Sequence, residues 1–357
     1  MVNEKKTSSL CSCAPKSDPH SFITLTSNNS PTSEIRTTTS SITLNDRLDH
    51  FFARIGVNRM EHIVKPGLYK LGAPNPDSLV FVSANYTLSF DALRCALAGT
   101  DCYILVLDTK GINVWCAAGK GTFGTEELVQ RISWSGLSII VRHRTVILPQ
   151  LGAPGISAPE VQRRSGFKVE FGPVRASDLP EYLKTHSATP EMRRVRFSLK
   201  DRLVLTPVEF RHAALPMIAA TIILYFLAGP LAALAAIATV MAGTVLFPAL
   251  LPFIPTHDFS TKGLILGGIV AIPFVISFGI DPAMPLLMKA ITSLALLLII
   301  PAVTAYLALN FTGCTTFTSR TGVKKEIYRY VPVMALMIVS GILLSIVLGV
   351  IRFKEMI

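Results

Sequence analysis

The stretch "LVFVSANYTLSFDALRCALAGTDCYILVLD" (Leu79–Asp108) decides the fold of the first half of the chain. Its first part, Leu79–Tyr86, is rich in β-branched and aromatic residues and predicts a strand. A short helix is expected next, with Ser89 as its N-cap and Gly99 as its stop. Asp101–Asp108 predicts a second strand, whose apolar middle is typical of a sheet covered on both faces. Strand, helix and strand in this order predict a parallel α/β sheet.

The same alternation continues to about residue 187. The further elements expected are helices over Thr125–Ile132 and Ala176–His186, and strands over Thr145–Leu148 and Phe167–Val174. We therefore predict a Rossmann-like α/β domain over residues 41–187. Ligands of such sheets lie at the carboxyl ends of the strands, so the segments after Asp108 and Leu148 form the expected binding edge.

The second half of the chain has the composition of a membrane domain. The chain has 357 residues, of which 50% are hydrophobic, and its mean hydropathy is +0.49. Between Ala213 and Asn310 the only charged residues are Asp258, Lys262, Asp281 and Lys289. A bilayer core of about 30 Å is crossed by a helix of about 20 apolar residues. We predict an all-α membrane domain over 213–357, with spans at roughly 209–229, 231–252, 263–280, 285–308 and 331–351.

The positive charge of the chain, +11 from 34 basic and 23 acidic residues, gathers beside the spans. The residues concerned are Arg193, Arg194, Arg196, Lys200, Arg202 and Arg211 before the first span, and Arg320, Lys324, Lys325 and Arg329 before the last. This pattern favours a multi-pass protein of the cytoplasmic (inner) membrane, with the α/β domain in the cytoplasm and the C-terminus outside. Residues 188–212 form a basic connector. Lipid phosphate, and no nucleic acid, is the expected partner of these charges.

The first 40 residues predict a disordered N-terminal tail. They are rich in Ser, Thr, Asn and Pro, and such a segment cannot bury enough apolar surface to fold. They hold no compact apolar segment, so no cleaved signal peptide is expected. The chain has six cysteines, two of them (Cys11 and Cys13) in this tail. Their spacings match neither a zinc site nor a disulfide framework.

A glycine-rich motif, "GINVWCAAGKGTFG" (Gly111–Gly124), follows the second strand. Gly119 to Gly124 match G-x-G-x-x-G, which binds dinucleotides when it directly follows a strand. Here about ten residues intervene after Asp108, and the region about 20 positions on contains no acidic residue for a ribose. The spacing therefore argues against a dinucleotide site.

Cys116 has the most reactive side chain in this motif. Asn113 is a plausible helix cap, which puts Cys116 in the first turn of a helix. A helix N-terminus and a nearby lysine such as Lys120 favour a thiolate, which is a nucleophile or a ligand of soft metals. The nearest candidate base for a nucleophile is His143, with no clear third member of a triad. The alternative is that Cys116 is a small buried side chain with no role as nucleophile or metal ligand.

The motif also carries a resemblance. "GINVWCAAGKGTFGTEELV" (Gly111–Val129) resembles the signature of the corrinoid protein of the bacterial mercury-methylation system, the HgcA family. Val64–Arg94, Ile147–Gly155 and Gly166–Leu183 are also similar to that family, as is a soluble domain ahead of five spans, so the resemblance covers about residues 41–351. One departure is Pro159, where many relatives are expected to have histidine. The soluble part is more distantly similar to the corrinoid-binding domain of the corrinoid iron–sulfur protein large subunit.

The resemblance implies a corrinoid cofactor of the cobalamin type, with Cys116 as the lower axial ligand of its cobalt. The implied activity is that of a membrane-anchored, corrinoid-dependent methyltransferase that passes a methyl group from methyl-cobalt(III) to Hg(II) and forms methylmercury. The small residues after the cysteine would let a wide, flat ring approach. The expected cofactor contacts are Asn113, Val114, Trp115, Cys116, Ala117, Ala118, Gly119, Lys120, Gly121 and Thr122, with Gln150, Gly152 and Ala153 from the second loop.

The family also implies partners. The chain has no run of four clustered cysteines for an iron–sulfur cluster, so a partner must supply electrons. The implied partner is a ferredoxin-like protein with two [4Fe–4S] clusters, and the implied methyl donor is a protein linked to methyltetrahydrofolate. Two alternatives stay open. One is a corrinoid methyl carrier of one-carbon metabolism with another acceptor, and the other is a membrane transporter with a cytoplasmic regulatory domain.

Overall fold

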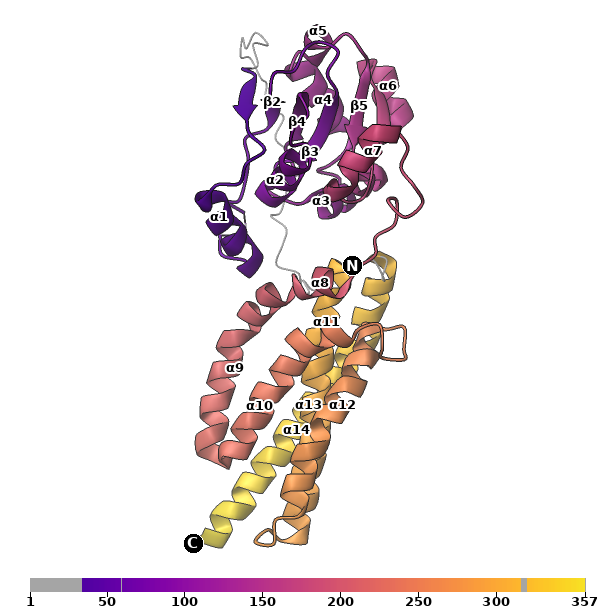
Figure 1. The fold of residues 1–357 in the computed structure, drawn as a ribbon. Helices are drawn as coiled ribbons and strands as arrows, with labels where there is room; N and C mark the ends of the chain where they lie inside the picture. The colour runs from indigo at the N-terminus through magenta and orange to yellow at the C-terminus, as the bar shows by residue number, and fades with distance from the viewer. Residues whose placement is uncertain (1–33, 59, 316–319, 357) are drawn as a thin grey trace, which may run out of the picture.

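The computed structural model describes residues 34–58, 60–315 and 320–356, and Figure 1 shows an α/β domain above a bundle of long helices. The described residues form a six-stranded sheet in the order β1-β2-β4-β3-β5-β6. Its strands are β1 (Arg36–Thr38), β2 (Gly67–Leu71), β3 (Val80–Ala84), β4 (Cys102–Leu107), β5 (Thr145–Leu148) and β6 (Lys168–Phe171). The α/β class predicted for this domain is confirmed.

The sheet is mixed, which corrects the prediction of a parallel sheet. Strands β4, β3, β5 and β6 run parallel to one another, whereas β2 pairs antiparallel with β4. The cause is the short connection 72–79 between β2 and β3. A parallel crossover takes a dozen or more residues, so the chain has to turn back after β2. The outermost strand β1, which pairs with β2, lies within the segment predicted to be a disordered tail.

Helices cover both faces of the sheet, as the apolar central strands predict. The helical segments of the domain are α1 (Leu44–Ile55), α2 (Thr87–Ala96), α3 (Val114–Lys120), α4 (Thr125–Trp134), α5 (Leu137–Ile140), η1 (Gln150–Gly155), α6 (Ala158–Ser165), η2 (Ala176–Asp178) and α7 (Leu179–Thr185). One apolar core contains Phe123, Leu128 and Phe167, and the other contains Phe90 and Leu97. The N-cap of α2 is Tyr86, not Ser89. The sequence pattern did not reveal α1 or α6.

The second half folds into five helices that are long and apolar enough to cross a membrane, within the residues described. They are built from α9 (Thr206–Ala228), α10 (Pro230–Met241) with η3 (Ala242–Leu246) and α11 (Phe247–Leu250), α12 (Phe259–Gly279), α13 (Leu286–Asn310) with η4 (Phe311–Cys314), and α14 (Arg320–Met356). Helix α8 (Leu199–Leu203) lies in the basic connector. The α/β domain and the start of α14 share one end of the bundle, and the C-terminus is at the other (Figure 1).

Small residues bring the central membrane helices together. A Cβ at Gly263 of α12 would lie 2.4 Å from the Ala305 Cα of α13, and one at Gly267 would lie 2.5 Å from the Pro301 Cα. Glycines four residues apart are the usual way for membrane helices to approach this closely. At the end nearest the α/β domain, the Glu326 carboxylate of α14 accepts hydrogen bonds from the first backbone amides of α12. The bundle is therefore fixed by close backbone packing and by this polar cap.

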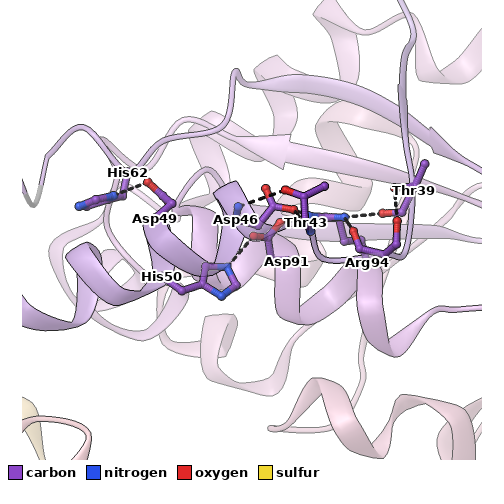
Figure 2. A network of polar contacts seen from close by, with 9 residues as sticks. Thr39, Thr43, Asp46, Asp49, His50, His62, Asp91 and Arg94 are labelled. Atoms are coloured by element: carbon purple, nitrogen blue, oxygen red, sulfur yellow. Dashed lines mark hydrogen bonds and ion pairs between the residues drawn. The ribbon is translucent and has the colours of Figure 1, made fainter.

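Helix α1 is held on the α/β domain by the polar network shown in Figure 2. The buried guanidinium of Arg94 donates to Asp91 at 2.6 Å and to Asp46 of α1 at 2.9 Å. It also donates to the carbonyl oxygens of Thr39 and Ser41. The Nε2 of His50 lies 2.6 Å from the other Asp91 oxygen. One arginine of α2 thus fixes both the start of α1 and the segment that connects β1 to α1.

A second histidine holds the far end of α1. Nδ1 of the buried His62 lies 2.6 Å from the Asp49 carboxylate, and Nε2 lies 2.7 Å from the carbonyl of Val57. Burial opposes protonation of the ring, but the hydrogen bonds to Asp49 and Val57 outweigh it, and the pKa of His62 is raised. Because both partners are acceptors, these contacts require a ring with two protons.

We expect Arg94→Met to destabilise the α/β domain by about 3–5 kcal/mol, because it leaves the Asp91 carboxylate buried without its main partner. The measurement is thermal unfolding of the full chain in detergent, with amide hydrogen exchange reporting on α1. Arg142→Met is the control, since the Arg142–Asp77 pair is exposed and such pairs contribute less than about 1 kcal/mol. Equal effects of the two substitutions would contradict the central role of Arg94.

Candidate functional site

Helix α3 starts at the carboxyl end of β4, where the sequence predicted it. The Oδ1 atom of Asn113 accepts a hydrogen bond of 2.9 Å from the backbone amide of Cys116, so Asn113 is the N-cap. Gly121, with a φ of 85°, ends the helix in the left-handed conformation that glycine adopts without strain. Cys116 therefore lies in the capped first turn of α3, and its side chain is partly exposed.

The loop that leads into α3 is fixed by Asn85, a residue that the sequence analysis did not single out. Its buried Oδ1 atom accepts hydrogen bonds from the Thr109 amide at 3.0 Å, the Thr109 hydroxyl at 2.8 Å and the Gly111 amide at 3.0 Å. Its Nδ2 atom donates to Asp108 at 3.3 Å. Asn85 directly follows β3, and a polar side chain at that edge of a buried sheet was the available signal.

The inner face of α3 packs directly on η1. Ala117 and Ala118 are buried in the core of the domain. A Cβ at Gly155 would lie 2.1 Å from the Phe123 carbonyl oxygen and 3.1 Å from the Ala118 Cα, and one at Gly152 would lie 2.5 Å from the Phe123 ring. Close packing between α3 and η1 therefore requires glycine at Gly155, and the Phe123 ring requires it at Gly152. The segment Gln150–Gly155, which was expected to be a loop, is a 3-10 helix.

Several other predicted contact residues also have structural roles. The Thr122 amide donates to the Ala117 carbonyl at the end of α3. The Gln150 side chain accepts a hydrogen bond of 2.7 Å from Arg193 of the connector. Ala153 is partly buried in η1. These roles neither require nor exclude contact with a cofactor.

The outer face of α3 is different in character. Trp115 and Cys116 are partly buried, and Gly119 and Lys120 are exposed. A Cβ at Gly119 would meet no atom within 4 Å. Glycine in a helix costs about 0.5–1 kcal/mol relative to alanine, and Cβ packing against the described residues does not require glycine at this position. The outer face thus presents the Cys116 thiol on the same short helix as Gly119, a position without a side chain.

A cavity of about 340 Å³ adjoins the first turn of α3 at the carboxyl edge of the sheet. Asn113, Val114 and Trp115 line one side of it. The remaining walls come from β3, α2, the end of β5 and the segment 172–179, and they are mainly apolar. The sequence placed the binding edge after β4 and β5, and the structure puts its cavity there.

Apart from Cys116, the other two cysteines whose side chains are described lie away from the binding edge. Burial raises the pKa of the Cys102 thiol to about 12, and burial also raises the pKa of Cys95. Both therefore stay protonated at neutral pH, away from the binding edge. His143, the candidate base, precedes β5 at the amino edge of the sheet, where its Nε2 contacts the Ser78 carbonyl. It lies at the edge opposite Cys116, so the structure does not support a Cys–His hydrolase.

Within residues 34–58, 60–315 and 320–356, no group of three or more His, Cys, Asp or Glu side chains is placed to hold a metal ion. The described part of the chain can thus offer a metal a single thiol at this edge. Cys11 and Cys13 lie outside the described residues.

Comparison with known proteins finds similarity over the α/β domain. The family described as CO dehydrogenase/acetyl-CoA synthase delta subunit matches residues 58–183, which include α3 and η1. The acetyl-CoA decarbonylase/synthase complex subunit gamma of Methanopyrus kandleri is 33% identical over 123 residues, which are 34% of this chain and 26% of that protein.

The subunit of the same name from Methanothermobacter thermautotrophicus is 31% identical over 127 residues, 35% of this chain and 27% of that protein. The Methanosarcina acetivorans subunit is 29% identical over 125 residues, 34% of this chain and 26% of that protein. The chain thus spans about a quarter of the length of these relatives. The match to the family ends at residue 183, ahead of the long helices.

Two glycine substitutions separate the two faces of α3. We expect Gly155→Ala to destabilise the domain by about 1–3 kcal/mol, because its Cβ would overlap the Phe123 carbonyl. We expect Gly119→Ala to stabilise it by about 0.5–1 kcal/mol, since its Cβ meets no atom and alanine favours the helix. Thermal unfolding of the full chain in detergent compares the two. A destabilised Gly119→Ala variant would contradict the open outer face.

Proposed function

We propose that this chain is a membrane-anchored protein of corrinoid-dependent methyl transfer, with Cys116 as the lower axial ligand of the corrinoid cobalt. The observation that carries the proposal is the partly exposed Cys116 thiol in the capped first turn of α3, beside the open surface at Gly119. The similarity to acetyl-CoA decarbonylase/synthase gamma subunits supports a role in one-carbon chemistry. The five apolar helices support membrane attachment.

The residues of the site fit a corrinoid. A corrin ring supplies four nitrogen ligands to its own cobalt, so the protein has to add only one axial ligand. A single thiol without a cluster of further ligands meets that need. The ring is wide and flat, and the outer face of α3 carries no large side chain at Gly119. The apolar cavity beside Trp115 offers room for a substituent of the ring.

Each residue of α3 would have a separate task. The Cys116 sulfur, as thiolate, would donate electron density to the metal, which a soft sulfur ligand does strongly. Asn113 would keep the first turn, and with it the sulfur, in a fixed position. Val114 and Trp115 would border the cofactor from the cavity side. When bound, the corrinoid supplies a methyl group on cobalt and the redox changes of that metal. Lys120, Gly121, Thr122, Gln150, Gly152 and Ala153 stay proposed contacts.

We further propose Hg(II) as the methyl acceptor and methylmercury as the product. This rests on the resemblance of Gly111–Val129 to the mercury-methylation family. Transfer of the methyl group as a carbanion equivalent requires two electrons before the next cycle. We assign their supply to a ferredoxin-like partner with two [4Fe–4S] clusters, and the supply of methyl groups to a donor protein linked to methyltetrahydrofolate. The proposed location is the cytoplasmic membrane, with the α/β domain in the cytoplasm.

A second acceptor is supported by the comparisons. The named relatives belong to a complex that makes or cleaves acetyl-CoA, so a methyl carrier of one-carbon metabolism is the alternative. Deletion of the gene separates the two proposals. Loss of methylmercury formation at unchanged growth supports Hg(II). Unchanged methylmercury formation together with a growth defect on one-carbon substrates supports the carrier.

The axial thiolate is tested by Cys116→Ala in the full chain loaded with methylcobalamin. We expect cobalt-edge X-ray absorption to show a sulfur neighbour of cobalt in the unchanged protein and none in the variant. Methyl transfer to Hg(II) should fall with it. Cys95→Ala is the matched control and should keep the sulfur neighbour, because Cys95 lies on α2 away from the edge. A corrinoid bound identically by all three proteins would overturn the proposal.

Gly119→Ala tests the flat surface independently of the sulfur. We expect this variant to be at least as stable as the unchanged chain but to bind corrinoid more weakly, because the added methyl group projects from the face that the ring would cover. Equilibrium dialysis against methylcobalamin measures the affinity. Unchanged affinity in a folded variant would show that the ring does not cover Gly119.

A further inference from the structure

Helix α1 is attached to the protein by its polar face. Asp46, Asp49 and His50 point to the α/β domain and bind Arg94, His62 and Asp91 there, as Figure 2 shows. Its large apolar side chains lie on the opposite side, and their exposed fractions are 78% for Leu44, 56% for Leu48, 57% for Phe51 and 43% for Phe52. A helix on the surface of a water-soluble domain has the reverse arrangement.

Helix α8, which lies just before the first membrane helix, also exposes apolar side chains. Leu199 and Leu203 of α8 are exposed. A groove between α1 and α8 is lined by Arg54, Leu199, Lys200, Leu203, Val204 and Pro207. We call the exposed apolar side chains of α1 and α8, together with the groove between these two helices, the α1–α8 face.

The position of α1 along α9 brings this face to the depth of lipid headgroups. Arg211 of α9 donates a hydrogen bond to the carbonyl of Gly56, the C-cap of α1, and Val208 packs beside it. Leu215, an exposed apolar residue of α9, lies four residues beyond Arg211. A helix rises about 1.5 Å per residue, which gives a separation of about 6 Å. The headgroup layer on each side of a bilayer is about 5–8 Å thick.

Basic side chains border the α1–α8 face, and the one acidic residue of α8, Asp201, is paired with Arg175. Arg47 and Arg54 of α1 are exposed at its border, and Lys200 of α8 is exposed beside the groove. Amphipathic helices that lie in the plane of a membrane combine an apolar face with lysine or arginine at the headgroup level. Each such basic residue adds about 1 kcal/mol of attraction to an anionic lipid surface.

We propose that the α1–α8 face inserts into the bilayer interface and binds anionic phospholipid. The occupant is lipid because α1 contacts a membrane helix at headgroup depth and because basic residues border the face. The α/β domain is then held to the membrane at two places, by the connector and by α1. The Arg94 network carries this second attachment, since it joins α1 to α2.

Photocrosslinking of the full chain tests the proposal. p-Benzoylphenylalanine is placed at Phe51, at Phe226 near the C-terminal end of α9 and at Ile139 on α5, and the chains are reconstituted in vesicles of phosphatidylcholine and phosphatidylglycerol. Phe226 (81% exposed) and Ile139 (90% exposed) are the lipid and water controls. We expect lipid adducts by mass spectrometry at Phe51 and Phe226 and none at Ile139. All three positions are exposed, so the folded state is kept.

Two results would overturn the proposal. A Phe51 position that gives only protein adducts would assign the face to another copy or another protein. A Phe51 position that gives no lipid adduct, like Ile139, would place the face in water. The role of charge is tested by Arg47→Glu with Arg54→Glu. We expect a lower lipid-adduct yield at Phe51 in vesicles with phosphatidylglycerol, and an unchanged yield at Phe226.

Discussion

A single buried carboxamide, that of Asn85, joins the end of β3 to the loop that follows β4. Its oxygen accepts three hydrogen bonds from Thr109 and Gly111, which leaves the chain only one direction in which to enter α3. The cap at Asn113 and the packing of α3 on η1 follow from that direction. The position of the Cys116 sulfur at the sheet edge therefore depends on a residue at the end of the neighbouring strand, and that residue does not line the cavity.

The sequence reveals the parts of this fold whose signal is local. The apolar runs of β3 and β4, the five apolar helices and the cap at Asn113 are each readable within a few residues. The reversal at β2 depends on the length of segment 72–79 relative to the crossover of a parallel pair, which no local pattern displays. Ala117 and Ala118 were attributed to a flat cofactor. The structure shows that they are buried against η1, a contact between segments about 35 residues apart.

Glycine serves two different purposes in this chain. Gly155 in the α/β domain and Gly263 in the bundle allow backbones to meet, and a methyl group at either would overlap a neighbour. A Cβ at Gly119 would meet no atom within 4 Å among the residues that the structure describes, so packing within that part of the chain does not require glycine there. The distinction cannot be made from the letters G-x-G alone. The structure makes this distinction, because it shows at which glycine a Cβ would overlap a neighbouring atom.

Helix α3 lies on the edge of the α/β domain that faces the bundle, and α5 lies on the far edge (Figure 1). This orientation decides how large molecules reach the cysteine. A protein that docks on α3 has to come in sideways, along the membrane plane, and it meets the end of the bundle at the same time. The recognition surface of such a partner must match both α3 and the end of the bundle. Selectivity among soluble partners would then be set partly by membrane helices that carry no chemistry of their own.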